Sequence, residues 1–258
     1  MQTAWVDFLR TPGEAGHAVQ IYAHVDELAE SVAAYLATGF AVGDPAVVIA
    51  RRRHQATFTQ VLAATGWDSD ALMAAGLLTT LDAEETLGLL LDGEEISVVA
   101  FEDVIGGLID RVADGRRVRA FGEMVDLLVE RGSPELAVAL EECWNELAQA
   151  RRFSLLCGYC LDVFDAEAQA ATLPAVCAAH THVRPAYDMP RLDRAVYDAF
   201  DEVLGSSSAR MVHGIVGDQS DEHSVPMSAQ MMMWISERMP RHAARVLSVA
   251  RANYERAA

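Results

Sequence analysis

The stretch that decides the fold runs from residue 118 to residue 164 and reads VRAFGEMVDLL (118–128), PELAVALEECWNELAQA (134–150) and FSLLCGYCLDVF (153–164). The two outer runs are short and apolar, as buried strands are. The middle run has apolar residues at helical spacing, and Ser133 and Pro134 suit its cap and first turn. This order predicts two parallel strands joined by a helical crossover.

One face of the middle helix is expected to lie on the sheet and the other to face away from it. The apolar face consists of Leu136, Leu140, Cys143 and Leu147. The residues expected to point away are Glu141, Glu142, Asn145 and Gln149. On the second strand, Cys157 and Tyr159 should share one face, because side chains alternate along a strand.

The same alternation of strands and helices precedes this stretch. Strands are expected in HAVQIY (17–22), in AVGDPAVVIA (41–50) and in GLLTTLDA (76–83). Helices are expected from Asp26 to a terminator at Gly39, over 54–64, and over 96–112, where strand and helix patterns compete. This alternating order of strands and helices predicts an α/β fold over residues 1–165, with a mostly parallel sheet flanked by helices.

The remaining residues, 166–258, have a different character. Helical patterns recur over 192–204 and in a last pair of helices separated by Pro240. Between them, the run 205–225 contains three consecutive serines and several glycines, which are typical of a flexible loop. We expect a helical C-terminal extension with a flexible loop near 205–225.

Composition narrows the classes of function. The formal net charge of -18 argues against a nucleic-acid-binding or anionic-membrane surface, which needs clustered Lys and Arg. No apolar segment approaches the roughly 20 residues that span a bilayer, and the N-terminal residues lack a signal-peptide pattern. We therefore expect a cytoplasmic protein, in which the four cysteines are free thiols or metal ligands.

Several segments together resemble the MEDS family of sensory domains, named after methanogen and methylotroph proteins and the regulator DcmR. They are HAVQIY, YLATGFAVGDPAVVIA, GWD, GLLTTLDA, RAFGEMVDLL, LEECWNEL and FSLLCGY, and they cover residues 16–164. The resemblance implies a RecA-like core related to the clock ATPase KaiC. It also implies sensing of small molecules such as hydrocarbon derivatives, with output through kinase, anti-sigma or DNA-binding modules.

The junction after the first strand departs from an ATPase. A P-loop needs GxxxxGK[ST] there, because backbone amides and a lysine hold the phosphates. The sequence at residues 22–28 is YAHVDEL, with no glycine and no lysine. We therefore expect a sensor instead of an enzyme, without a cofactor, that binds a small organic ligand at a degenerate nucleotide site. Its signal would pass by contact with a protein partner or a second copy of the chain.

The candidate ligand-binding residues lie on or just beyond the predicted strands. Arg51 and Glu123 follow two strands at their carboxyl ends, where open α/β sheets bind ligands. Glu123 has a second interpretation as the buried ion-pair partner of Arg51 or Arg119. The resemblance favours a functional role for His17 and Tyr22, which lie at the two ends of the first strand. The full predicted set is His17, Tyr22, Arg51, Glu123, Cys157 and Tyr159.

A zinc site is the main alternative. Cys157-x2-Cys160 followed by Cys177-x2-His180, with His182 as a spare ligand, is close to the spacing of a zinc ribbon. The first pair, however, lies in a predicted strand, which argues against both a zinc knuckle and CxxC redox chemistry. An enzyme using Glu123 and a histidine is a further alternative, although no motif pairs an obvious nucleophile with a base.

Overall fold

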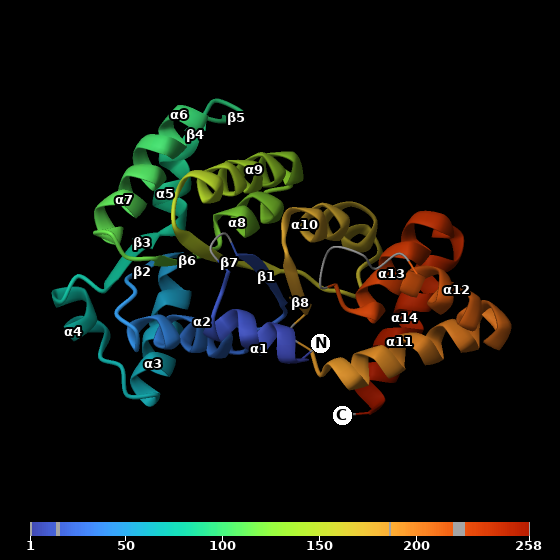
Figure 1. Ribbon diagram of the computed structural model, residues 1–258. Helices are drawn as coiled ribbons and strands as arrows, with labels where there is room; N and C mark the ends of the chain where they lie inside the picture. Colours follow the sequence, from blue (N-terminus) through green and yellow to red (C-terminus); the bar gives the residue numbers. More distant parts are fainter. Residues whose placement is uncertain (1, 14–15, 186, 219–224, 258) are drawn as a thin grey trace. The chain divides into compact units, whose positions relative to one another are not determined.

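A computed structural model describes residues 2–13, 16–185, 187–218 and 225–257 (Figure 1). The chain divides into two compact units. The first, which we call the sheet unit, consists of residues 2–20 and 24–160. The second, the C-terminal unit, consists of residues 21–23 and 161–258, within the described ranges. Each unit is described by itself.

The sheet unit is built on strands in the order β3-β2-β6-β7-β1. The pairings of β2 with β3, of β2 with β6 and of β6 with β7 are all parallel. All residues of β2 and β6 are buried, which explains why β2 is a continuous apolar run and why β6 is apolar except at Arg119. The predicted parallel α/β sheet is confirmed. The strands are β1 His17–Tyr22, β2 Ala46–Ala50, β3 Leu78–Asp82, β6 Val118–Gly122 and β7 Phe153–Cys160.

Helices cover both faces of this sheet (Figure 1). One face carries α1 Gln2–Arg10, α2 Val25–Phe40 and α3 Arg52–Ala64. The other face carries α5 Ala83–Leu90, α7 Gly107–Ala113, α8 Met124–Glu130 and α9 Pro134–Ala150. The smaller elements are α4 Ser69–Ala74, the hairpin of β4 Leu91–Asp92 and β5 Glu95–Ile96, α6 Val98–Phe101 and a π-helical turn, Glu102–Gly106. This arrangement agrees with the predicted layers.

Two details of the sheet unit differ from the sequence prediction. Helix α2 begins at Val25 with His24 at the N-cap, and it continues through Gly39 instead of ending there. A Cβ atom on Gly39 would lie 2.5 Å from Cδ of Arg119, so glycine is needed for close packing and not as a terminator. The second difference is α8, a separate helix where the sequence indicated only the end of an apolar run.

The C-terminal unit is largely helical, as expected. Strand β8, His182–Pro185, lies next to β1, whose last residues Ile21 and Tyr22 belong to this unit. Helix α11 packs against α14. The helices are α10 Leu173–Ala179, α11 Met189–Leu204, α12 Ser206–Asp218, α13 Met227–Arg238 and α14 Pro240–Arg256, and a π-helical turn, Ala168–Thr172, precedes α10. No helix in the described part of the chain combines the length and apolar character that a bilayer crossing requires.

The flexible loop predicted near 205–225 is wrong for residues 206–218, which form α12. Ala209, Val212 and Val216 are buried and recur at helical spacing, so their burial outweighs the turn preference of the serines. Residues 219–224 of the predicted loop lie outside the described residues.

Candidate functional site

The first group of buried polar side chains lies at the carboxyl ends of β2 and β6. Arg51 directly follows β2 and Glu123 directly follows β6, and because the strands are parallel and adjacent, the two residues meet. Arg51 Nη1 donates to Asp126 Oδ2 at 2.6 Å and lies 3.4 Å from Glu123 Oε2. Its Nη2 donates to Glu130 Oε2 at 2.9 Å. The predicted Arg51–Glu123 ion pair is therefore present.

Helix α3 and strand β7 are tied to the same group. His54 Nδ1 lies 2.7 Å from Glu123 Oε2, and the Cys160 amide donates to Asp126 Oδ1 at 2.8 Å. Burial raises the pKa of Asp126, and the neighbouring Arg51 guanidinium opposes that rise. We call Arg51, His54, Glu123, Asp126 and Glu130 the carboxyl-edge network.

Arg119, the other predicted partner of Glu123, lies elsewhere. Its guanidinium donates to the carbonyl oxygens of Leu9 and Tyr35, both at 2.9 Å, and its Nε is 3.8 Å from Asp44 Oδ2. Arg119 thereby joins α1, α2 and β6. Its position indicates a structural role.

A pocket of about 530 Å³ opens beside the carboxyl-edge network. This volume falls within the range of small-molecule sites. Arg52 on its wall pairs with Asp82 and Glu85. The Arg53 side chain forms no ion pair or hydrogen bond with any residue in the described ranges. The lining consists of Arg51, Arg52, Arg53, Asp82, Glu84, Glu85 and Glu130.

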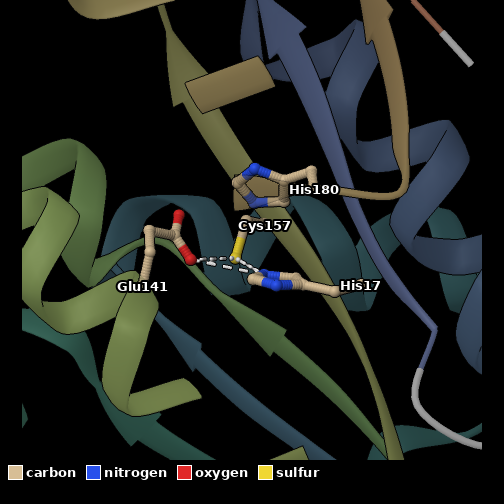
Figure 2. Close-up of side chains that lie close together, drawn as sticks. All are labelled: His17, Glu141, Cys157 and His180. Carbon is tan, nitrogen blue, oxygen red and sulfur yellow. Dashed lines mark hydrogen bonds and ion pairs between the residues drawn. The ribbon is translucent and has the colours of Figure 1, made fainter. Parts of the chain in front are cut away.

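The second group, which we call the buried cluster, consists of His17, Glu141, Cys157 and Tyr159. In Figure 2, His17 projects from β1, Cys157 from β7 and Glu141 from α9 toward a common point. His17 Nε2 lies 3.3 Å from Cys157 Sγ and 3.3 Å from Glu141 Oε2. Cys157 Sγ lies 3.9 Å from the same carboxylate oxygen. Tyr159 donates to the other oxygen, Oε1, at 2.8 Å, so Cys157 and Tyr159 share a face as predicted.

The buried cluster is closed to solvent. The exposed fractions are 3% for His17, 2% for Glu141, 0% for Cys157 and 1% for Tyr159. Burial and the adjacent Glu141 carboxylate raise the pKa values of the Cys157 thiol and the Tyr159 hydroxyl well above their ordinary values. Both groups are therefore held in their protonated forms in the described structure.

The sequence pattern did not predict Glu141 as a site residue, because a charged residue on this helix was expected to point away from the sheet. Instead it lies on the buried face of α9, which also contains Ala137, Leu140 and Trp144. Glu141 is four residues after Ala137 and three before Trp144, so the helical spacing did contain a signal. Asn145 was also expected to point away, but its Oδ1 accepts a hydrogen bond from His17 Nδ1 at 2.9 Å, which places the ring proton on Nδ1.

A nucleophile and a base are also adjacent, contrary to the sequence prediction. Cys157 Sγ, His17 Nε2 and Asn145 Oδ1 follow one another in the order of a Cys-His-Asn catalytic triad. Nucleophilic cysteines, however, need a lowered pKa and an open approach. The Cys157 thiol has a raised pKa and is fully buried, so it has neither of these two features in this structure.

The structure divides the remaining predicted residues between the units. Tyr22 is buried at the end of β1, in the C-terminal unit. Cys160 is exposed at the end of β7, whereas Cys177 is buried on α10, where desolvation raises its pKa to about 12. His180 follows α10 and His182 begins β8, both in the C-terminal unit; His180 is also drawn in Figure 2.

The predicted zinc-ribbon ligands do not form a set in the described structure. Within the described ranges, no group of three or more potential metal ligands includes Cys160, Cys177 or His182. Strand geometry explains this for the first pair, because residues three apart on a strand face opposite sides.

Comparison with known proteins shows the family to which the chain belongs. A search of curated proteins found no match. The family model described as the methanogen/methylotroph, DcmR sensory domain, MEDS, matches residues 16–181, which is more than half of the chain. The match extends beyond residue 164, where the resemblance in the sequence ends, and includes α10. The chain therefore belongs to the MEDS family of sensory domains.

Proposed function

We propose that the protein is a small-molecule sensor in signal transduction, and that its ligand is a small organic molecule with one anionic group. The ligand would bind in the pocket beside the carboxyl-edge network and signal through contact with a protein partner. The observation that carries this proposal is Arg53, a cation on the pocket wall whose side chain has no ion-pair partner within the described residues.

The position of the pocket supports the proposal. Open α/β sheets bind ligands beyond the carboxyl ends of their strands, and Arg51 and Glu123 mark those ends here. The acidic residues Asp82, Glu84 and Glu85 on the pocket wall would repel a polyanion such as a nucleotide. A ligand with a single carboxylate meets one available guanidinium without that penalty.

The carboxyl-edge network offers a route for the signal. The side chain of Glu130 is 62% exposed, and it holds Arg51 from the end of α8. A ligand carboxylate near Arg51 would compete with Glu130 for the guanidinium and release the last residue of α8 from Arg51. Asp126 and Glu123 would keep Arg51 in place, because both remain buried beside it.

A binding screen tests the proposal. Short carboxylic acids, the matched alcohols and amines, and nucleotides would be compared by thermal shift and then by calorimetry. At least one acid should raise the melting temperature in a concentration-dependent manner, because ligands that bind the folded state stabilise it. Binding by nucleotides alone would contradict the proposed ligand class.

Arg53→Gln supplies the sharper result. Loss of a charge-assisted contact costs about 1.5–3 kcal/mol, so its affinity for the acid should fall about tenfold to a hundredfold. Arg111→Gln is the matched control, since Arg111 is exposed on α7 and does not line the pocket. If no acid binds at millimolar concentration, or if Arg53→Gln binds it as well as the wild type, the proposal fails.

A further inference from the structure

We propose that His17, Glu141 and Cys157 of the buried cluster form a binding site for a divalent transition-metal ion of the zinc class. The site is separate from the proposed ligand pocket, and the inference does not depend on that proposal. It also differs from the zinc ribbon suggested by the sequence. The sheet unit contains two of the cysteines predicted for that ribbon, Cys157 and Cys160, and the proposed site uses only Cys157.

The separations of the three atoms carry the inference. Usual zinc bond lengths and a tetrahedral angle place nitrogen and oxygen ligands about 3.4 Å apart, and sulfur about 3.6 Å from either. The observed separations are 3.3 Å for His17 Nε2 to Glu141 Oε2, 3.3 Å for Nε2 to Cys157 Sγ and 3.9 Å for Sγ to Oε2. Each edge of the triangle is therefore within a few tenths of an ångström of a metal-bound geometry.

The separation of His17 Nε2 and Glu141 Oε2 fits a hydrogen bond less well than it fits a shared metal ion. A nitrogen–oxygen hydrogen bond has its usual length near 2.9–3.0 Å, whereas His17 Nε2 and Glu141 Oε2 are 3.3 Å apart. Asn145 Oδ1, 2.9 Å from His17 Nδ1, accepts the ring proton and leaves the Nε2 lone pair directed at the carboxylate and the sulfur. A cation among these atoms would turn three electron-rich groups into ligands.

The surrounding contacts are those of a supported metal site. A metal-binding histidine usually donates its other ring N–H to an oxygen, and Asn145 provides that oxygen. A ligating carboxylate is usually hydrogen-bonded in turn, and Tyr159 donates to Glu141 Oε1 at 2.8 Å. The orientations of both ligands, one on β1 and one on the buried face of α9, are thereby fixed.

Charge balance favours the same class of ion. A thiolate and a carboxylate neutralise a divalent cation, and a neutral imidazole completes the set. Cysteine and histidine ligands select zinc-class ions over magnesium or calcium, which prefer oxygen ligands throughout. Binding would release the Cys157 thiol proton to solvent, because the thiolate is the ligand.

Cobalt(II) titration of the purified protein, after treatment with a chelator, tests the site directly. The wild type should bind one equivalent and develop sulfur-to-cobalt charge-transfer absorption together with visible bands of a tetrahedral ion. Zinc should displace the cobalt and abolish the colour, because tetrahedral sites with a thiolate ligand favour zinc. Protein purified without chelator should contain about one equivalent of metal by elemental analysis after dialysis.

Variants separate this site from other thiols. Cys157→Ser should lose the charge-transfer band, and His17→Gln and Glu141→Gln should each weaken binding at least tenfold. Tyr159→Phe should weaken it about tenfold to a hundredfold, as changes beyond the direct ligands do. Cys143→Ser is the matched control, because Cys143 is a buried thiol on α9 outside the group of candidate ligands.

Two results would overturn the inference. One is wild-type protein that remains folded by circular dichroism but binds neither cobalt nor zinc; hydrogen bonds alone would then join the three side chains. The other is Cys157→Ser with an unchanged cobalt spectrum. If a ligand variant does not fold, the charge-transfer band of the wild type decides the matter, together with Cys143→Ser and Cys177→Ser.

Discussion

Replacing Arg51 by methionine would remove the cation of the carboxyl-edge network while keeping most of the apolar stem. Arg51 lies 2.6 Å from Asp126, 2.9 Å from Glu130 and 3.4 Å from Glu123. Asp126 would lose its cation while 2% exposed, and would keep the Cys160 amide as a hydrogen-bond donor. We expect Arg51→Met to destabilise the sheet unit strongly.

The contacts that Arg51 makes determine how large the loss in the free energy of unfolding should be. Breaking a buried pair by removing one partner costs about 3–5 kcal/mol, because the other charge stays buried. Glu130 adds at most about 1 kcal/mol, since its side chain is 62% exposed and solvent screens it. Glu123 keeps His54, which lies 2.7 Å away. The free energy of unfolding should therefore fall by about 3–5 kcal/mol at pH 7, mostly through Asp126.

The loss should depend on pH in a definite direction. Burial raises the pKa of Asp126 above its ordinary value of 3.8, so the folded state binds this proton more tightly than the unfolded state. Such a group favours the fold below its unfolded pKa, and that contribution is lost as the pH rises through its folded pKa. Removing the Arg51 cation raises the folded pKa further. The destabilisation should thus be larger at pH 7 than at pH 5.

Urea unfolding at both pH values measures these quantities. Arg52→Met is the matched control, because its side chain is 74% exposed and solvent screens its ion pairs with Asp82 and Glu85, so this variant should lose little stability. Adding Asp126→Asn to Arg51→Met removes the stranded charge and should restore part of the stability. A loss below about 1 kcal/mol at pH 7, or no recovery in the double variant, would refute the reasoning.

Two further predictions concern the sheet unit and its thiols. Gly39→Ala should reduce the free energy of unfolding by about 1–3 kcal/mol, because its Cβ would meet Arg119 Cδ at 2.5 Å; Gly88→Ala, a helical control with no atom within 4 Å, should be neutral or slightly stabilising in urea. In the folded protein a thiol reagent should label Cys160 alone, since it is exposed and the other three cysteines are buried. Its rate should rise with pH into the alkaline range, because burial and Asp126 raise its pKa; rapid labelling of Cys160→Ser would contradict this assignment.

The sequence predicted the sheet well, for a physical reason. Strands β2 and β6 are buried on both faces, so they appear as short, mostly apolar runs that are followed by the charged residues Arg51 and Glu123. The pairing of Arg51 with Glu123 followed from the same logic, because the carboxyl ends of adjacent parallel strands lie at one edge. What the pattern could not give was the contribution of α8, whose residues Asp126 and Glu130 complete the network.

The contacts of the buried cluster could be predicted from the sequence only in part. Cys157 and Tyr159 were placed on one face correctly, since alternation along a strand is a local property. Their contact with Glu141 depends on how α9 is rotated over the sheet, which local spacing constrains only weakly. His17 is still farther away in sequence, and its approach to Cys157 depends on the offset between β1 and β7.

Strand β1 also affects how the chain can be divided into fragments, because it contributes residues to both units. Its first four residues belong to one unit, and Ile21 and Tyr22 belong to the other, whose remaining residues begin at position 161. The C-terminal unit is thus encoded by two separate parts of the gene. A fragment that begins at residue 161 would therefore lack Ile21 and Tyr22, the residues of the C-terminal unit that lie on β1.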